Sequence, residues 1–568
     1  MDKKFCRLLL GFFFFLPPTF AQAAPTPADL RSQEAIVQQQ EQKILAQDAE
    51  KERDRRSKEQ LFQLSKKKEH SKNIELPEES PSFVIREFKV RGDFAAKQFS
   101  WIKTYLRQYE GQKIGIQGMN LLVKEINESL VAKGYITTRV YLKEQDIASG
   151  ILMLDLQPGT IGAIRFADPH TWGTWKNAFS VRKGDLLNIR DLEQGLEQMK
   201  RVPSQEVDIK IVPAQTPGQS DIVLSVKRSK PWKIVTSLDD SGLKSTGKLQ
   251  ATTALEIDNF FSMNDILNIS LNEDAEKHGQ QRGTRASSLY YSIPFGKDTL
   301  TFSTSTYNYH QLVTTAVNPF LSSGNMDNYD FGITHLLQRD QTRKTNMELH
   351  IIKKHRHSYI DDEEITVQRQ DTTAVQLGIT HKQYIGKGTL DAALRYQQGV
   401  RWLGAKAGPT DGMPDEPTTQ YGMFLFDLTW NTPLKMGAKT GQYNFMFRTQ
   451  QTSDHLYGSE FFSIGGRYSV RGFDGEQNLS AENGFLIRNE WRYPLNQEHQ
   501  LYAAMDYGKV SGPSAQFLTG TELMGAAIGL RGNIKNTQYD VFVGWPIEKP
   551  DGFKTAAQTY GFQLTMQI

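Results

Sequence analysis

Arg471 stands in the segment of this sequence whose residue types most clearly suggest chemistry. It lies within the glycine-rich stretch FFSIGGRYSVRGFDGE, residues 461–476. A guanidinium is costly to bury unless a carboxylate meets it, and Asp506, in the segment AAMDYG, is a suitable partner. Spacing alone leaves two interpretations open. One is a buried bidentate pair that pins a loop inside a barrel, and the other is a β-hairpin with two unrelated exposed charges.

Two other stretches resemble ligand sites but are better explained without a ligand. GLKSTGKL, residues 242–249, nearly matches a nucleotide-binding loop, yet Leu249 occupies the place of the magnesium-binding hydroxyl and a strand-like pattern follows it. In HIIKKHRH, His355 and His357 would share one strand face, but the interspersed lysines and arginine would repel a cation. The sequence therefore predicts a β-turn and a basic strand end, with no metal and no cofactor.

Composition excludes several functional classes. Lys and Arg number 67 and Asp and Glu 64, so the net charge is only +3. This excess of positive charge is too small to indicate nucleic-acid binding. The single cysteine is Cys6, which excludes a disulfide, and its removal with a signal peptide would also exclude a cysteine nucleophile. No Gly-x-Ser-x-Gly elbow is present. We expect a protein that is not an enzyme.

The N-terminal region predicts export and then a polar helix. Residues 1–23 combine basic residues, a short apolar run and a small-residue end, which is typical of a cleaved signal peptide. No later stretch is apolar for long enough to form a transmembrane helix. Residues 29–71 are rich in Gln, Glu, Lys and Arg, and Pro77 and Pro81 follow them. By composition this is a solvated helix followed by a charged linker.

Two small α/β modules follow. The first, residues 82–157, reads as strand, helix, helix, strand, strand, with strands expected at 83–92, 135–142 and 150–159. The second, residues 158–229, repeats that order, with a weak helix expected at 172–179 and a clearer one in NIRDLEQGLEQMKRV. A repeated module of this kind indicates binding more than catalysis.

From residue 230 to residue 568 the pattern changes to strands in which apolar and polar residues alternate. Such strands have one apolar face and one polar face. The length suits sixteen transmembrane strands of about 10 residues with their turns and loops. A β-sandwich array would also alternate, but the aromatic-rich last strand and the predicted export favour a membrane barrel.

Several motifs together resemble the two-partner secretion transporters, the TpsB family. VRGF resembles the family tetrad at the tip of a loop folded back into the pore, GFLIRNE its next-strand pattern, and AMDYG its strand motif with a central aspartate. GYITTRVYLKEQDIASGILMLDLQPG, residues 134–159, resembles the end of the first POTRA domain in haemolysin-type and contact-dependent-inhibition members. One departure is the terminal Ile568, where such barrels usually end in an aromatic residue. The motif residues are Val470, Arg471, Gly472, Phe473 and Asp506 for the pore-loop lock, and Gly484, Arg488, Asn489, Glu490 and Gly508 for the barrel strands.

The resemblance implies an architecture. It is a transmembrane antiparallel β-barrel of 16 strands (230–568) with two N-terminal periplasmic α/β POTRA domains (82–157 and 158–229) and an N-terminal plug helix (24–47), joined by a linker (48–81) and preceded by a signal peptide (1–23). It also favours pairing of Arg471 with Asp506. The expected location is the Gram-negative outer membrane, with the POTRA domains in the periplasm.

The resemblance further implies a type V, two-partner secretion channel. Its substrate would be a large unfolded partner protein, an adhesin, cytolysin or contact-dependent toxin, which crosses without nucleotide hydrolysis. The other expected partners are outer-membrane lipid and the barrel-assembly machinery, with no nucleic acid. An extended substrate can add to a sheet edge, and the candidate edge residues are Glu206, Ile209, Ile211, Ile222 and Leu224. The alternatives are an outer-membrane assembly insertase and a passive porin or receptor.

Overall fold

The computed structural model describes residues 27–58, 74–94, 97–314 and 318–568, with the side chains of the first range described from 34 to 56. The predicted signal peptide, residues 1–23, and residues 59–73 of the predicted linker lie outside this described part. Within it, no helix has both the length and the apolar character needed to cross a membrane.

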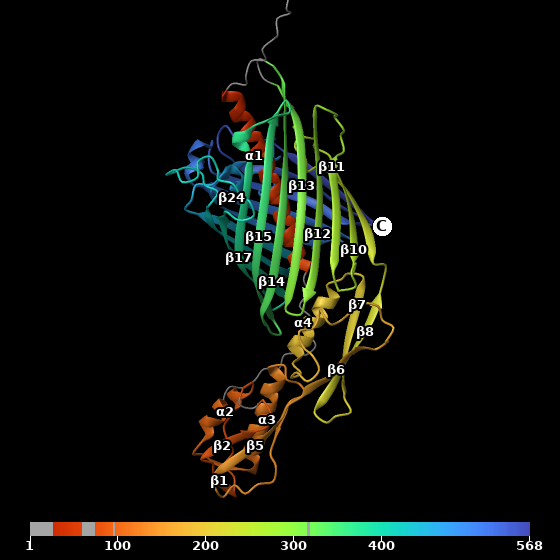
Figure 1. Ribbon diagram of the computed structural model, residues 1–568, viewed down its shortest axis with the longest axis vertical. Coiled ribbons are helices and arrows are strands. Elements are labelled where there is room, and N and C mark those ends of the chain that lie inside the picture. The colour runs from red at the N-terminus through yellow and green to blue at the C-terminus, as the bar shows by residue number, and fades with distance from the viewer. Residues whose placement is uncertain (1–26, 59–73, 95–96, 315–317) are drawn as a thin grey trace, which may run out of the picture.

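The C-terminal part of the chain is a closed antiparallel β-barrel, as the alternating pattern predicts (Figure 1). In the described residues, sixteen long strands form the ring, and the two-residue strand β16 (Glu363–Glu364) pairs antiparallel with the end of β15. The long strands are β9 (Trp232–Asp239), β10 (Gln250–Asp258), β11 (Ile266–Asp274), β12 (Arg282–Phe295), β13 (Asp298–Val313), β14 (Phe320–Arg339), β15 (Arg343–Ile360), β17 (Gln370–Ile385), β18 (Gly388–Val400), β19 (Gly422–Met436), β20 (Lys439–Thr452), β23 (Asn483–Pro494), β24 (His499–Ser511), β25 (Glu522–Ile534), β26 (Thr537–Glu548) and β27 (Thr559–Gln567). The last strand, β27, closes the ring on β9 from Gln563↔Asp239 to Gln567↔Val235.

The two faces of each barrel strand differ as a period of two requires. In β15, Met347 and Leu349 are 41% and 39% exposed and point outward. Glu348, between them, points inward and accepts a hydrogen bond from the Arg395 guanidinium at 3.4 Å. An apolar exterior with a charged interior suits a barrel that has lipid outside and polar contents inside.

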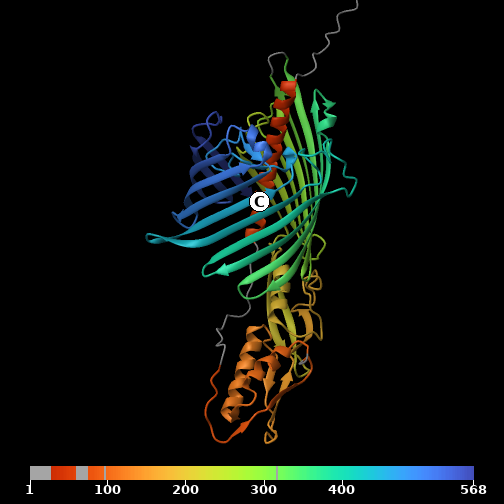
Figure 2. The ribbon, with the colours of Figure 1, turned by 90° about the vertical axis from the view of Figure 1, so that its left-hand side faces the viewer.

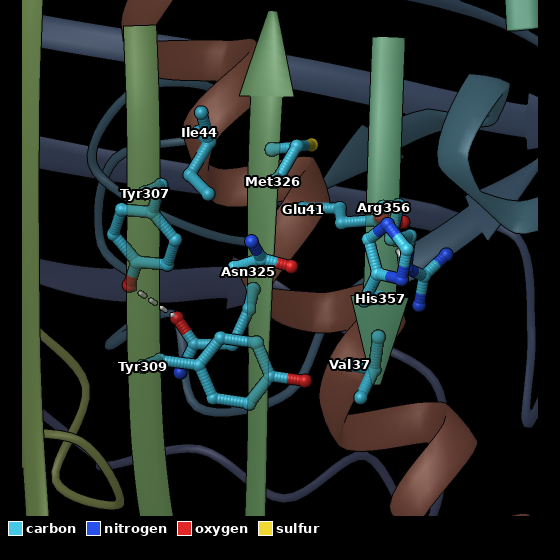
Figure 3. A pocket seen from close by; sticks show the side chains of 10 residues that line it. Val37, Glu41, Ile44, Tyr307, Tyr309, Asn325, Met326, Arg356 and His357 are labelled. Atoms are coloured by element: carbon cyan, nitrogen blue, oxygen red, sulfur yellow. Dashed lines mark hydrogen bonds and ion pairs between the residues drawn. The ribbon is translucent and has the colours of Figure 1, made fainter. Parts of the chain in front are cut away.

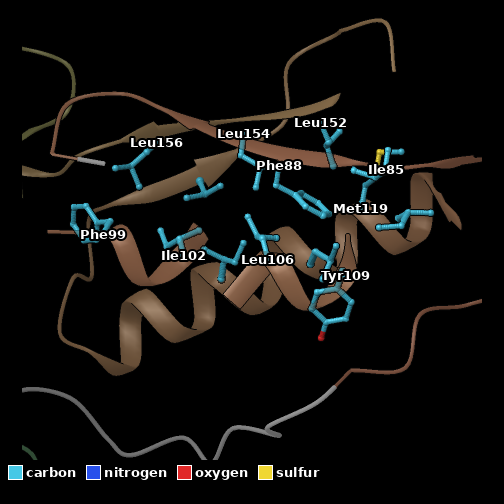
Figure 4. Packing of buried hydrophobic residues seen from close by; sticks show 14 of the residues in the cluster. Ile85, Phe88, Phe99, Ile102, Leu106, Tyr109, Met119, Leu152, Leu154 and Leu156 are labelled. Atoms are coloured by element: carbon cyan, nitrogen blue, oxygen red, sulfur yellow. The ribbon is translucent and has the colours of Figure 1, made fainter. Parts of the chain in front are cut away.

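The first α/β module has its own buried core (Figure 4). The predicted first strand is divided into two short strands, and the predicted strand at 135–142 shrinks to three residues, but the two helices and the final strand are where the pattern places them. Phe88, Ile102 and Leu122 are fully buried between sheet and helices. The elements are β1 (Ser82–Val84), β2 (Glu87–Arg91), α2 (Ser100–Leu106), the 3-10 turn η1 (Arg107–Tyr109), β3 (Lys113–Gly115), α3 (Ile116–Ala132), β4 (Arg139–Tyr141) and β5 (Ile151–Gln157).

The second α/β module corrects two predictions. It contains β6 (Thr160–Phe166), α4 (Ile189–Lys200), β7 (Gln205–Pro213) and β8 (Gln219–Arg228). The helix expected at 172–179 is wrong: that segment is a turn-rich loop, in which only the last residues wind back on themselves, with the Ala178 amide donating to the Trp175 carbonyl at 3.0 Å. The sheet order is β6-β8-β7, so β8 is the central strand and cannot be an edge.

Helix α4 docks the second module onto the turns at one end of the barrel. The Glu197 carboxylate accepts hydrogen bonds from Lys344 Nζ at 2.6 Å and from Arg339 Nη1 at 2.5 Å. Gln198 Nε2 donates to the Gly296 carbonyl at 3.3 Å. Burial raises the pKa of Glu197, but the two cations outweigh it, so the pKa lies below its ordinary value. The carboxylate is therefore ionised at neutral pH, and it fixes the module against the barrel.

Helix α1 (Pro27–Lys58) lies inside the barrel along its axis, as two perpendicular views show (Figures 1 and 2). The predicted end at residue 47 is wrong, because the helix continues to Lys58. Its last turns consist of good helix formers with ion pairs one turn apart, including Asp48 with Lys51 at 3.3 Å and Glu52 with Arg56 at 3.4 Å. Part of the predicted linker is therefore helix.

Candidate functional site

A long segment between β20 and β23 folds back into the barrel, and we call it the pore loop (residues 453–482). It contains the 3-10 turn η3 (Gly458–Glu460) and a short hairpin of β21 (Phe462–Ile464) and β22 (Leu479–Ala481). The VRGF tetrad follows β21. The pore loop therefore brings Arg471 to the inner faces of β23 and β24.

The structure brings together the predicted pair, Arg471 and Asp506. Nε of Arg471 donates to Oδ2 of Asp506 at 2.7 Å, and Nη2 donates to Oδ1 at 2.8 Å. The Arg471 amide also donates to Oδ2, at 3.0 Å. The two residues are only 6% and 1% exposed. A planar guanidinium that matches both carboxylate oxygens is the geometry in which a buried pair is strongest.

Glu490 is a second carboxylate partner of Arg471, a role that sequence reasoning missed. It accepts a hydrogen bond from Nη1 of Arg471, while Nη2 donates to the Asn489 carbonyl at 3.2 Å. Glu490 also contacts Arg531, at 3.3 Å. The available signal was strand alternation, since Arg488 and Glu490 must share one face of β23. Arg488 lies across from Asp506 in the strand register, with its Nε 3.6 Å from Oδ2.

Apolar packing surrounds this charged centre. Val470 and Phe473 are 0% and 3% exposed, and Phe473 meets the edge of the Phe553 ring with centroids 5.8 Å apart. Gly472 has a φ of +104°, and a Cβ there would lie 2.4 Å from the Trp545 carbonyl oxygen. Only glycine suits both the conformation and this close approach. We call Val470, Arg471, Gly472, Phe473 and Asp506, together with Glu490, the pore-loop lock.

The two glycines of the strand motifs lie against the pore loop. A Cβ on Gly484 would lie 2.4 Å from the Phe462 ring, and one on Gly508 would lie 2.8 Å from Ile464. The two strands therefore present no side chain at the positions where β21 packs on them. This gives the Gly484 and Gly508 positions a steric role that complements the ionic role of Arg488 and Glu490.

Helix α1 fills the lumen beside the lock mostly through polar contacts. Gln40 Nε2 donates to Oγ1 of Thr246 at 3.0 Å, and the Tyr307 hydroxyl donates to Gln40 Oε1 at 3.0 Å. Gln39 Nε2 donates to the Gly475 carbonyl of the pore loop at 3.0 Å. Near the other end of the helix, Lys382 Nζ donates to the Arg56 carbonyl at 3.1 Å. The helix is thus attached along its length to both the wall and the pore loop.

Glu41 makes the most enclosed ion pair between the helix and the wall. Its Oε1 lies 2.8 Å from Nε of Arg356 on β15, and the two side chains are 6% and 9% exposed. The pair borders a pocket between α1 and strands β13 to β15, into which Tyr309 and Asn325 also project (Figure 3). Sequence reasoning could not find this pair, because the two residues are far apart in the chain and the basic stretch that contains Arg356 does not indicate its partner.

Glu50 connects the helix to the lock itself. Its Oε2 lies 3.2 Å from Nη1 of Arg488, the residue that also approaches Asp506. The same carboxylate pairs with Arg53 on the helix. Arg488 further donates to the Tyr468 carbonyl of the pore loop at 3.3 Å. One arginine therefore joins helix, pore loop and barrel strand.

The predicted substrate-binding residues lie on two strands of the second module, of which only one is at the edge of the sheet. Ile222 and Leu224 are fully buried on the central strand β8, so their prediction as edge residues is wrong. Glu206, Ile209 and Ile211 lie on β7, which pairs only with β8 within the described residues. Of these, Glu206 is exposed, whereas Ile209 and Ile211 pack against the module core. The free main-chain side of β7 remains a candidate edge.

The other stretches singled out from the sequence have structural roles. The Gly242 amide donates to the Lys248 carbonyl at 2.8 Å in the turn between β9 and β10, as expected for a β-turn. His350 contacts Asp330 at 2.9 Å, and His357 contacts Glu364 at 2.7 Å. In the described residues, no group of three His, Cys, Asp or Glu side chains is placed to bind a metal ion.

Comparisons with known families match nearly all of the described chain outside helix α1. The haemolysin secretion/activation protein model (ShlB/FhaC/HecB) matches residues 218–532. A ShlB-type POTRA domain matches residues 83–159, and a second POTRA domain matches residues 160–213. The two POTRA matches cover the first module and the second module up to β7, and the family model covers β8 and the barrel as far as β25.

Curated relatives and solved structures agree with this assignment. The outer membrane transporter CdiB-2 of Burkholderia pseudomallei is 39% identical over 574 residues, covering 96% of this chain and 97% of that protein. The haemolysin transporter ShlB of Serratia marcescens is 30% identical over 380 residues, covering 66% of each chain. The structure of CdiB from Acinetobacter baumannii superposes with a TM-score of 0.82 at 27% identity, covering 94% of this chain and 99% of that one. With its 16-stranded barrel and its two periplasmic POTRA domains, this chain belongs to the haemolysin secretion/activation (ShlB/FhaC/HecB) family of outer-membrane transporters.

Proposed function

We propose that this chain exports one large, unfolded partner protein from the periplasm through its barrel to the cell surface. The observation that carries the proposal is the content of the lumen, where helix α1 and the pore loop lie together inside a closed ring. A passive porin needs an open aqueous channel, whereas this barrel must release its helix before a polypeptide can pass. The partner classes that fit are an adhesin, a cytolysin and a contact-dependent toxin.

The contacts of helix α1 suit a plug that leaves. Its hydrogen bonds to Thr246, Tyr307 and Gly475 are those of neutral amides and hydroxyls. Water can replace such bonds in an emptied lumen, so that each contributes about 1 kcal/mol to the closed state. These weak contacts, together with the ion pairs of Glu41 with Arg356 and of Glu50 with Arg488, hold the plug closed at rest. A competing chain can displace it, because the two arginines face the aqueous lumen once the helix has left.

The pore-loop lock suits a part that stays. Arg471 is buried between two carboxylates, and Val470 and Phe473 are in an apolar cluster. Removing one member of a buried ion pair costs about 3–5 kcal/mol, because the other charge is left unpaired. We therefore assign the moving role to helix α1 and the fixed role to the pore loop, which would form part of the wall of the conducting path.

Substrate capture is assigned to the second POTRA domain. The unpaired side of β7 offers main-chain donors and acceptors to an extended peptide, which gives affinity without one required sequence. The export step needs no nucleotide or other cofactor in this proposal, because folding of the partner outside traps it there by mass action. The chain would thus act as a channel and not as an enzyme. Outer-membrane lipid and the barrel-assembly machinery would be its other partners, and nucleic acid would not be one.

The test is secretion of the proposed large partner protein, in cells that carry both proteins. Arg471→Ala should lower the amount of partner in the medium at least tenfold per folded barrel. The matched control is Arg343→Ala, which removes an arginine whose carboxylate partner, Asp340, lies on the surface of a periplasmic turn. Wild-type secretion by Arg471→Ala at a normal barrel level would refute the lock. If loss of the chain lowered other outer-membrane barrels and left the partner unaffected, the insertase alternative would replace this proposal.

A further inference from the structure

The periplasmic rim of the barrel carries exposed aromatic side chains from two different domains. Trp172 of the second POTRA domain is 54% exposed, and Phe260 and Phe261, in the turn between β10 and β11, are 52% and 61% exposed. Trp232, at the start of β9, is 44% exposed. We call these four residues the aromatic rim. Single exposed apolar side chains are common, but several that lie together mark a surface that a partner or a membrane covers.

The rim continues the lipid-facing surface of the barrel. The Phe261 ring meets the Tyr291 ring edge-on, with centroids 5.9 Å apart. Tyr291 pairs in register with Phe302, which is 38% exposed on the outer face of the barrel. Trp232 pairs in register with Ile257 across β9 and β10. The turn at Phe260 and Phe261 therefore lies at the level where the apolar belt of the barrel ends on the periplasmic side.

Trp172 is fixed beside this turn although it belongs to a different domain. The Thr174 amide donates to the Ser262 carbonyl at 3.2 Å, and Asn264 Nδ2 donates to the Thr174 carbonyl at 2.8 Å. A Cβ on Gly173 would lie 3.4 Å from the Ser262 carbonyl oxygen, so the two segments touch. The segment around Trp172, which the sequence pattern wrongly predicts as helix, is thus an irregular loop docked on the barrel.

Cations accompany the tryptophans. The Arg228 guanidinium lies 5.1 Å from the Trp172 ring centroid, and the Lys230 ammonium lies 3.6 Å from that of Trp232. Two buried carboxylates of this region already have partners: Asp258 accepts from the Ser204 amide, and Asp265 accepts from the Phe261 amide. The surface thus offers aromatic rings and positive charge together, which is the chemistry of a membrane interface with anionic headgroups.

We propose that the aromatic rim is a membrane anchor that holds the second POTRA domain against the periplasmic leaflet of the outer membrane, with Arg228 and Lys230 binding the phosphates of anionic phospholipids. The rings occupy the headgroup region, where an amphipathic indole is most stable. The anchor fixes the angle of the substrate-binding domain relative to the pore. The anchor requires only the outer-membrane location, so its validity does not depend on which partner is secreted.

The test uses the full chain in nanodiscs of phosphatidylethanolamine and phosphatidylglycerol that contain a headgroup-proximal spin-labelled lipid. Since Cys6 is the only cysteine and lies in the predicted signal peptide, Trp172→Cys can carry a single bimane label in the indole position. The matched control is Thr216→Cys, an exposed site in the turn between β7 and β8. We expect at least threefold stronger quenching at residue 172 than at residue 216. Equal quenching at the two sites would overturn the anchor.

Two further measurements separate the aromatic and ionic parts. Adding Arg228→Gln and Lys230→Gln to the labelled protein, or omitting phosphatidylglycerol, should reduce quenching at residue 172 at least twofold; no change in either case would refute the anionic headgroup. Without a label, Trp172→Phe should lower the quenching of intrinsic fluorescence by brominated lipid, and unchanged quenching would show that the native indole lies outside the membrane. Heat-modifiable migration in gels verifies that each variant has a folded barrel. Secretion is not the readout, so a failure here leaves the proposed export function intact.

Discussion

Replacing Glu41 with glutamine should release the plug. In the closed barrel the Glu41 carboxylate lies 2.8 Å from Nε of Arg356, and both side chains are less than a tenth exposed. Glutamine has a similar shape but no charge, so the Arg356 guanidinium would stay buried against the helix without its counter-ion. When the helix has left, the same guanidinium faces the aqueous lumen and needs no partner. The substitution therefore destabilises the closed state more than the open one.

The expected magnitude follows from this geometry. Truncating one member of a buried charge pair costs about 2–5 kcal/mol. We take the lower end, about 2 kcal/mol. A second carboxylate, Glu460, which pairs with Lys354, lies near Glu41 and would compensate part of the Arg356 charge. Since 1.4 kcal/mol is a factor of ten in an equilibrium constant, the ratio of open to closed channels should rise about 30-fold.

The assay is single-channel recording in planar bilayers, with open probability as the readout. Asp48→Asn is the matched control, because it neutralises a carboxylate of the same helix whose ion-pair partner, Lys51, lies on the helix itself. That variant should stay within twofold of the wild type. Arg356→Gln should open the channel as Glu41→Gln does, and the double variant should be less open than the sum of the single effects predicts, because no unpaired charge remains. Open probability equal to the wild type in Glu41→Gln would refute the reasoning.

The remaining predictions concern the lock, the docking of the second POTRA domain and an extracellular loop. Arg471→Lys should reduce secretion nearly as much as Arg471→Ala, because an ammonium cannot bind both oxygens of Asp506 and Glu490 at once; secretion within twofold of the wild type would contradict this. Glu197, whose pKa burial raises but Lys344 and Arg339 lower overall, stabilises docking above its ordinary pKa of 4.5 and loses this effect as pH falls through the lower docked value. Protection of the α4 amides, taken relative to the intrinsic exchange rate at each pH, should accordingly fall on acidification in the wild type, and in Glu197→Gln it should be low at every pH; protection that does not change with pH in the wild type would be the opposing result. Asp411 accepts hydrogen bonds from the amide and hydroxyl of Thr419 and from the Gly408 amide, so Asp411→Asn should expose the loop between β18 and β19 to protease on whole cells at least tenfold faster, with secretion unchanged; equal cleavage rates would show that Asp411 does not order the loop.

Local patterns were sufficient for much of the fold. Side chains of a strand alternate between two faces, so the sequence alone predicts which barrel residues face lipid, as Met347 and Leu349 do. The same rule places Asp506 toward the lumen, and the VRGF resemblance supplies its partner, Arg471. These predictions succeed because they depend on neighbours within a few residues or on a motif that carries its own context.

Predictions that depended on distant pairing could not be made from the pattern. The β8 segment has the same alternation as an edge strand, but pairing with β6 makes it central and buries Ile222 and Leu224. The loop at 172–179 is apolar enough for a helix, yet hydrogen bonds to the β10–β11 turn replace helical ones. Helix α1 ends at Lys58, and not at residue 47, because local ion pairs extend it.

Short-range periodicity in the amino-acid sequence predicts the barrel, the two modules and the polar helix, and the family resemblance adds the pair between Arg471 and Asp506. The contacts that need the folded chain are those of Glu41 with Arg356, those of Glu50 and Glu490 with the charges around the lock, and those of the loop at Trp172 with the turn that holds Phe260 and Phe261. No local pattern predicts these contacts, because they join segments 88 or more residues apart or, for Glu490 and Arg471, segments that the folded pore loop brings together. Their positions are set by closure of the barrel around the helix, which no local pattern contains.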